Sequence, residues 1–278
     1  MFDIITALVT PFKEDNRIDY LSIHRLMDYL IKEGNTHFVL CGTTGECSCL
    51  SMKEKIEYIH YMIQHFKQCR FIVGISSNCT KEAIYQMEQL SIIEKIEAWL
   101  VVTPYYNKPN QEGLFQHFDA IAKASDKNII LYNVPSRTSV TLQTNTIINL
   151  VKNNDNIIGL KEAGDIKDAV LLKEQLPGFC VYLGSDELLE AAIMMELDGV
   201  ISVASHLLYK TMEDAARKEA IDYFDYKLKV NYLFKDSSPA PIKYLLSQKK
   251  LIQNYLRLPL VPVSNEMSAQ LNRVFRSN

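Results

Sequence analysis

Eight short apolar segments recur along the chain and alternate with segments of helical period. Strands that alternate with helices pair in parallel through right-handed crossovers. Eight such units in about 230 residues have the size of one closed (β/α)8 barrel. The predicted strands are Ile4–Val9, His37–Gly42, Phe71–Ser76, Ala98–Thr103, Asn128–Val134, Ile157–Glu162, Cys180–Gly184 and Gly199–Val203.

A doubly wound open sheet is the alternative arrangement for the same order of elements. That fold normally carries a glycine-rich phosphate turn after its first strand, whereas here the turn reads Thr-Pro-Phe-Lys. The α/β barrel is therefore favoured, as a domain of residues 1–235. Residues 236–278 follow the eighth unit, are again helical in pattern, and are expected to form a C-terminal helical extension.

Composition and charge exclude several classes of protein. The chain of 278 residues is 47% hydrophobic and 23% charged, with a net charge of −3. It contains no long basic run that would draw it to nucleic acid, no apolar stretch long enough for a membrane, and no basic leader, so we expect a cytoplasmic protein. Cys47 and Cys49 form a lone pair without a second pair to complete a zinc site, which favours reduced thiols.

Lys161 ends one of the predicted strands, although lysine is rarely buried without a partner. Tyr132 ends the preceding strand, and neighbouring strands lie about 4.8 Å apart, so the two side chains can face each other at the barrel mouth. Burial disfavours a charged ammonium group, and a neutral amine attacks carbonyls to form a Schiff base. The alternative, an ion pair of Lys161 with Glu162, conflicts with the alternation of side chains along a strand.

Three further strand ends carry polar groups, and active sites of such barrels lie at these ends. The turn "GTTGE" places Thr43 and Thr44 between glycines, where backbone and hydroxyl donors could hold a carboxylate; a plain glycine turn is the alternative. In "TPYYNKP" one tyrosine could enter the site while the other faces an interface, or both could simply pack. In "YNVPSRT", Arg137 is a fork suited to a carboxylate, or a surface arginine.

Taken together, these segments resemble a known family. "GTTGE", "TPYYNKP", "YNVPSRT", "IIGLKEA", "GVISV" and the late "RLPL" occur in the order found in the dihydrodipicolinate synthase family of the pyruvate-dependent class I aldolases. The resemblance spans nearly the whole chain. It implies condensation of pyruvate with L-aspartate 4-semialdehyde on the route to lysine, without a metal or organic cofactor.

The resemblance also implies catalytic roles. Lys161 would form the imine with pyruvate, and Tyr132 would donate and accept protons. Thr43 and Tyr106 would complete a proton relay with Tyr132. Tyr106 would reach the site of a neighbouring subunit, so a homodimer or homotetramer is expected.

Binding roles follow from the same resemblance. Thr44 and the backbone at Ile201 would hold the pyruvate carboxylate, and Arg137 would hold the carboxylate of the aldehyde. One departure concerns "GSDE" after the seventh strand, where the family more often has Ser-Gly before acidic residues. This displaced glycine puts a backbone contact to the aldehyde in question.

Two rival functions remain open at this point. N-acetylneuraminate lyases and 2-keto-3-deoxy-sugar-acid aldolases would share Lys161 and Tyr132, but the paired threonines and Arg137 favour the synthase. A non-catalytic keto-acid sensor would need no proton relay, and the residues of a complete relay are present.

Overall fold

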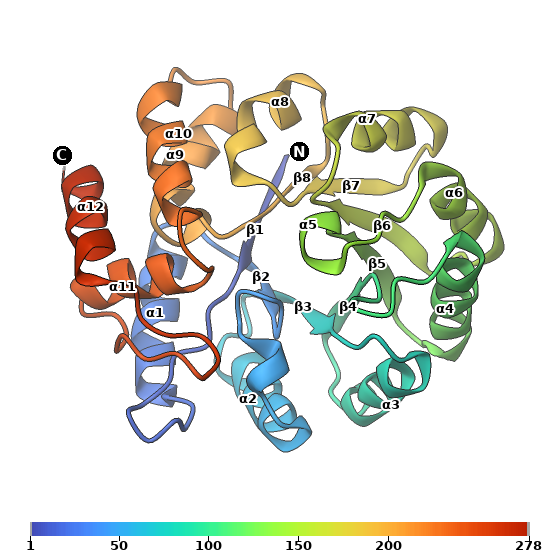
Figure 1. Cartoon of the computed structure of the whole chain (residues 1–278), viewed down its shortest axis with the longest axis horizontal. Coiled ribbons are helices and arrows are strands. Elements are labelled where there is room, and N and C mark those ends of the chain that lie inside the picture. Colours follow the sequence, from blue (N-terminus) through green and yellow to red (C-terminus); the bar gives the residue numbers. More distant parts are fainter. Residues whose placement is uncertain (1, 277–278) are drawn as a thin grey trace.

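Eight parallel strands close into a barrel that helices surround (Figure 1). In this computed structural model, which describes residues 2–276, β8 pairs with β1 as well as with β7. The prediction of a (β/α)8 barrel is confirmed, and the doubly wound alternative is wrong because an open sheet lacks the β1–β8 pairing. The strands are β1 Asp3–Ala7, β2 His37–Leu40, β3 Arg70–Ile75, β4 Ile96–Val102, β5 Asn128–Asn133, β6 Ile157–Glu162, β7 Cys180–Leu183 and β8 Gly199–Ser202.

The helices cover the outside of the barrel and extend it at the C-terminal side. Those of the barrel are α1 Tyr20–Lys32, α2 Met52–His65, α3 Thr80–Ser91, α4 Gln111–Ala124, α5 Pro135–Thr138, α6 Thr144–Asn153, α7 Ile166–Gln175, α8 Leu189–Met194 and α9 Ser205–Ala216. Short 3-10 turns stand at Cys47–Cys49 and Asp186–Leu188. Helices α10 Tyr223–Leu233, α11 Ala240–Gln248 and α12 Asn265–Phe275 follow. None of the helices within residues 2–276 is long and apolar enough to cross a membrane.

Local sequence explains where α2 begins. Ser51 accepts a hydrogen bond from the Glu54 backbone N–H at 3.3 Å, and the Glu54 carboxylate accepts one from the Ser51 N–H at 2.9 Å. This reciprocal capping box satisfies two backbone donors that a helix start leaves unpaired. The pattern Ser-Met-Lys-Glu therefore fixes the start of α2 at Met52.

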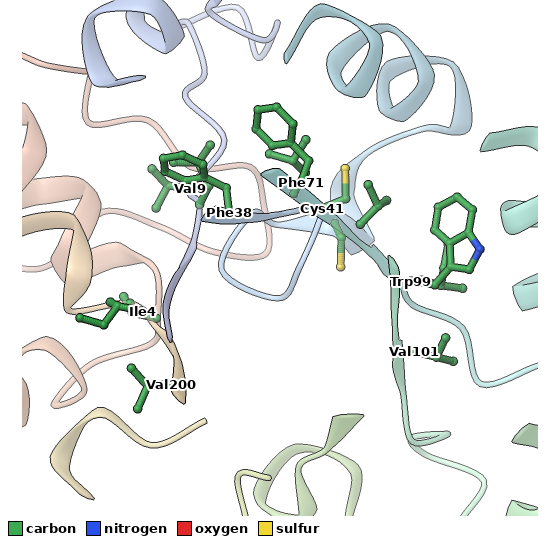
Figure 2. Packing of buried hydrophobic residues seen from close by; sticks show 14 of the residues in the cluster. Ile4, Val9, Phe38, Cys41, Phe71, Trp99, Val101 and Val200 are labelled. Atoms are coloured by element: carbon green, nitrogen blue, oxygen red, sulfur yellow. The ribbon is translucent and has the colours of Figure 1, made fainter. Parts of the chain in front are cut away.

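Alternation along the strands divides the apolar residues between two cores. On β4, Ala98, Leu100 and Val102 belong to a cluster inside the barrel. Trp99 and Val101 lie on the other face of the strand, in the cluster between sheet and helices (Figure 2). Because both faces are buried, the strands read as continuous apolar runs, as expected for a parallel barrel.

The last three helices pack against one another beside the barrel, on the side of α1 (Figure 1). A hydrogen bond from the Arg25 guanidinium in α1 to the Leu251 carbonyl, at 3.4 Å, joins this region to the barrel. The helical character predicted for residues 236–278 agrees with α11 and α12. The division into a domain of residues 1–235 and an appendage of 236–278 stays a prediction.

An ionic cluster gathers at the N-terminal ends of the first four strands. The ring of His37 lies 2.8 Å from the Asp3 carboxylate and 3.4 Å from Glu97. Arg70 pairs with Glu97 at 2.5 Å and with Asp3 at 3.7 Å. Burial by itself raises the pKa of Glu97, but hydrogen bonds from His37 and Arg70 outweigh it and lower that pKa to about 2. This cluster ties four strands together at the end of the barrel away from the predicted site.

We expect Glu97→Gln to lower the free energy of unfolding at pH 7 by about 2 kcal/mol, because it removes a charged hydrogen-bond partner. The pKa of Glu97 is depressed from 4.5 in the folded state. Its contribution is therefore complete above about pH 4.5 and is lost as the pH falls toward 2. Thermal unfolding should show the two proteins converging over that range, while the exposed control Glu57→Gln behaves like wild type. A constant difference at every pH would contradict this assignment.

Candidate active site

A cavity of about 220 Å³ lies at the C-terminal ends of the strands. Its walls come from the ends of β5, β6 and β8 and from the turns after β2, β5, β6, β7 and α10. Six of the seven residues predicted from the sequence line it: Thr43, Thr44, Tyr132, Arg137, Lys161 and Ile201. Phe234 and Ser238 also line it and were not predicted, because the segment after α10 gives no strand-end signal that would place it at the barrel mouth.

Lys161 and Tyr132 face each other inside the barrel mouth. They are register partners on β6 and β5, and Nζ of Lys161 lies 4.4 Å from the centroid of the Tyr132 ring. Both residues are only 8% exposed. Leu160 belongs to the outer core, so alternation turns Lys161 inward. The predicted arrangement of these two side chains is confirmed.

The next residues on the same two strands point outward and hold the strand ends together. Nδ2 of Asn133 donates to both oxygens of Glu162, at 2.9 and 3.1 Å, and the Gly164 N–H donates to the same carboxylate at 2.6 Å. Burial raises the pKa of Glu162 to about 7. The alternative ion pair between Lys161 and Glu162 is absent from the described residues. The Asn133–Glu162 contact instead keeps Tyr132 opposite Lys161.

Arg137 lies in the one-turn helix α5, which directly follows the end of β5. Its backbone N–H donates to the Val134 carbonyl at 2.9 Å. Oδ1 of Asn133 accepts a hydrogen bond from Leu142 N–H at 3.0 Å, which pins the far end of this segment. The guanidinium is thus carried on a short, anchored turn at the edge of the cavity.

Residues 42–46 follow β2 and form a tight turn, here called the threonine turn, which is closed by hydrogen bonds of its own backbone. Gly45 N–H donates to the Gly42 carbonyl at 3.0 Å, and Glu46 N–H donates to the Thr43 carbonyl at 3.1 Å. Thr44 is 6% exposed. The turn places two hydroxyl groups on the cavity wall, where they are available to a carboxylate or a proton relay.

Tyr106 is the one predicted residue that does not line the cavity. Its side chain is 89% exposed, and its backbone is left-handed with φ 74°. Tyr105 is 36% exposed and lines an adjoining cavity together with Thr43 and Arg137. Within one chain, the structure therefore does not bring Tyr106 to Lys161.

Gly184 lies directly against the lysine. A Cβ atom at this position would stand 3.0 Å from Cε of Lys161 and 2.8 Å from Cβ of Ala163. Distances below about 3.0 Å are avoided by real Cβ atoms. The glycine that looks displaced in the sequence is the one that leaves room for the Lys161 side chain.

Asp186 braces the wall formed by β8. Its carboxylate accepts hydrogen bonds from the backbone N–H groups of Val203 and Ala204, both at 2.9 Å. Burial raises its pKa, and the hydrogen bonds from Ser202, Ala204 and Val203 partly oppose that effect. This contact holds the end of β8, and with it the backbone at Ile201, beside the lysine.

All six cysteines are free, as the sequence indicated, and Cys47 lies 3.3 Å from Oγ of Ser76. Within residues 2–276, no group of three or more histidine, cysteine or acidic side chains is arranged to hold a metal ion.

A buried lysine that packs on a tyrosine at the mouth of a (β/α)8 barrel is the arrangement expected of an enzyme that forms a Schiff base with a carbonyl substrate, as class I aldolases do. The family model for the dihydrodipicolinate synthetase family matches residues 1–277. The chain belongs to this family.

Individual relatives agree with that membership. The 4-hydroxy-tetrahydrodipicolinate synthase of Leuconostoc mesenteroides is 38% identical over 98% of this chain and 97% of its own length. A crystal structure of dihydrodipicolinate synthase from Bacillus anthracis has a TM-score of 0.92 at 34% identity, covering 100% of this chain and 99% of its own. The enzyme from Acinetobacter baumannii, solved in complex with pyruvate, has a TM-score of 0.91 at 36% identity, covering 98% and 97%.

The contact of Gly184 with Lys161 makes a testable prediction. In Gly184→Ala the new methyl group would stand 2.8 Å from Cβ of Ala163 and 3.0 Å from Cε of Lys161, so the turn after β6 must shift and the lysine must move slightly with it. We expect imine formation with pyruvate to slow about tenfold, at a stability cost of about 1–3 kcal/mol for overpacking. Rapid-quench borohydride trapping measures the rate. Gly113→Ala, in α4, is the matched control and should react at the wild-type rate; an unchanged rate in Gly184→Ala would contradict the assigned contact.

Proposed function

We propose that this protein condenses pyruvate with L-aspartate 4-semialdehyde, through an imine on Lys161, to give 4-hydroxy-tetrahydrodipicolinate in the diaminopimelate route to lysine. The family and the names of its relatives support the reaction. The observation that carries the residue assignment is the packing of the buried Lys161 amine on Tyr132, within a cavity that also contains Arg137.

The first step forms the imine. The amine of Lys161 attacks the keto carbon of pyruvate, and the resulting carbinolamine loses water. We assign the proton transfers of both events to the phenol of Tyr132, because it is the ionisable side chain that packs against the lysine, with Nζ 4.4 Å from the ring centroid. Thr43 lines the same cavity and is the hydroxyl that we assign to a relay with Tyr132.

The pyruvate carboxylate is held by Thr44 and by the backbone at Ile201. Both line the cavity, and Ile201 belongs to β8, whose end Asp186 braces. Fixed donors of this kind orient the substrate without rearranging during the reaction. A pyruvate held by its carboxylate presents its keto carbon to Lys161.

Carbon–carbon bond formation follows. Loss of a methyl proton converts the imine to an enamine, whose carbon attacks the aldehyde of the semialdehyde. Arg137 binds the carboxylate of that substrate through a planar, permanently charged guanidinium. The substrate's own amine then attacks the imine carbon, which closes the ring and releases Lys161 unchanged.

The relay is completed between subunits. Tyr106 is 89% exposed in the isolated chain, which is unusual for a large aromatic side chain. A neighbouring subunit that covers it would bring its hydroxyl to Thr43 and Tyr132 of the other site. We propose a homodimer or homotetramer on this ground. The cytoplasmic location stays a prediction.

Arg137 separates the synthase from the sugar-acid aldolases, whose aldehydes carry no carboxylate at that place. We expect Arg137→Met to raise the KM for the semialdehyde about 30-fold, equivalent to about 2 kcal/mol for a lost charged hydrogen bond. Borohydride trapping of pyruvate should be unchanged.

The assay couples product to the next, NADPH-dependent reductase. N-acetylmannosamine, run in parallel with wild type, should give no condensation. Turnover with the amino sugar and none with the semialdehyde would contradict the proposed substrate.

Mixing of subunits tests the position of Tyr106. Lys161→Ala and Tyr106→Phe should each be nearly inactive alone. A mixed dimer contains one site with both groups intact if Tyr106 acts on its neighbour. Random exchange should therefore restore about one quarter of wild-type activity. No recovery in mixtures shown to exchange subunits would contradict the role between subunits.

A further inference from the structure

The threonine turn is held from behind by the C-terminal region. Glu46, the last residue of "GTTGE", has a left-handed backbone with φ 53°, a strained conformation for a residue other than glycine. Its N–H closes the turn on the Thr43 carbonyl at 3.1 Å. The Gly45 carbonyl accepts a hydrogen bond from Oγ1 of Thr10 at 2.8 Å. The turn therefore needs contacts outside itself to keep its shape.

The Glu46 carboxylate makes two of these contacts, both with the C-terminal region. It pairs with Nζ of Lys243 at 2.5 Å, and both side chains are 0% exposed. Its second oxygen accepts the Arg257 backbone N–H at 2.9 Å, and Lys243 also donates to the Tyr255 carbonyl at 2.8 Å. Lys243 comes from α11 and Arg257 from the link between α11 and α12, about 200 residues away from the turn.

The Arg257 side chain binds the residues that follow the threonine turn and lead into α2. Its guanidinium donates to the Cys49 carbonyl at 2.6 Å and to Glu54 at 3.0 Å. It lies 4.4 Å from the centre of the Phe12 ring, over which Nζ of Lys243 also stands at 4.3 Å. Figure 1 shows this link, in red, beside the loop that leads into α2. The C-terminal segment thus brackets the threonine turn and the start of α2.

A buried ion pair is a costly way to stabilise a fold. Apolar residues of similar volume often do as well or better, because both charges lose their water. Burial lowers the pKa of Lys243 to about 8 even though Glu46 favours its charged form. Unlike apolar packing, the hydrogen bonds of such an ion pair are directional, so they hold the attached segment in one geometry. Here that segment is the turn with two hydroxyls on the cavity wall.

We infer that Glu46 is a positioning residue for pyruvate binding, and that Lys243 and the Arg257 backbone N–H hold it so that Thr43 and Thr44 face Lys161. Residues 240–257 of the C-terminal extension then contribute to the active site without contacting substrate through these groups. The inference rests on the proposed function, because it assumes that Thr44 holds the pyruvate carboxylate.

The test removes both charges together. Glu46→Gln/Lys243→Met leaves no lone buried charge, so it should melt close to wild type. We expect its KM for pyruvate to rise about tenfold and its borohydride-trapping rate at low pyruvate to fall about tenfold, with the KM for the semialdehyde unchanged. Glu97→Gln, which breaks the ionic cluster at the opposite end of the barrel, is the control. It should lose stability and keep the wild-type KM for pyruvate.

The results for the wild type and for the double variant test the proposed function and the positioning role separately. A wild-type protein that forms no trapped pyruvate adduct would contradict the proposed function itself. Suppose instead that the wild type forms the adduct and that the double variant has the same KM for pyruvate and the same trapping rate. That result would overturn the positioning role of Glu46 and leave the proposed function standing. If the double variant does not fold, Glu46→Gln is measured below its melting temperature. A rise confined to the KM for pyruvate supports the role, and an equal loss of every rate overturns it.

Discussion

The contact between Lys161 and Tyr132 is the interaction on which the rest of the site depends. It exists because β5 and β6 pair in a register that sets these two residues side by side. The hydrogen bonds between Asn133 and Glu162 hold that register from the other face of the sheet. A slip of one residue would turn the lysine out of the cavity. The position of the reactive lysine therefore depends directly on the strand register of the barrel.

The two ends of the barrel differ in role: one carries stabilising ion pairs and the other carries the cavity. At the N-terminal ends of the strands, ion pairs join the side chains of His37, Asp3, Arg70 and Glu97. At the C-terminal ends, polar groups line a cavity and leave room for a ligand. This division is general for the fold, in which the bottom face serves stability and the top face serves function.

Local patterns predicted a large part of this architecture. Continuous apolar runs revealed strands buried on both faces, and a lysine at the end of such a run marked the site because burial of an amine needs a reason. Alternation alone indicated that Lys161 would not pair with Glu162, and the structure agrees. The helical turn that carries Arg137 was missed, because four residues are too few to show a period.

Long-range contacts could not be predicted from the sequence. The pairing of Glu46 with Lys243 joins residues 197 positions apart, and no local signal connects them. Gly184 looked like a displaced residue, and only the position of the Lys161 side chain explains it. Tyr106 remains a prediction, since its proposed partners lie in a second subunit.

The measurement that tests the central claim most directly is borohydride reduction in the presence of pyruvate, followed by peptide mass mapping. We expect a single reduced pyruvate adduct per chain, on the peptide that contains Lys161, and none in Lys161→Ala. An adduct on a different lysine, or none in an active wild-type enzyme, would contradict the assignment of Lys161 as the imine-forming residue.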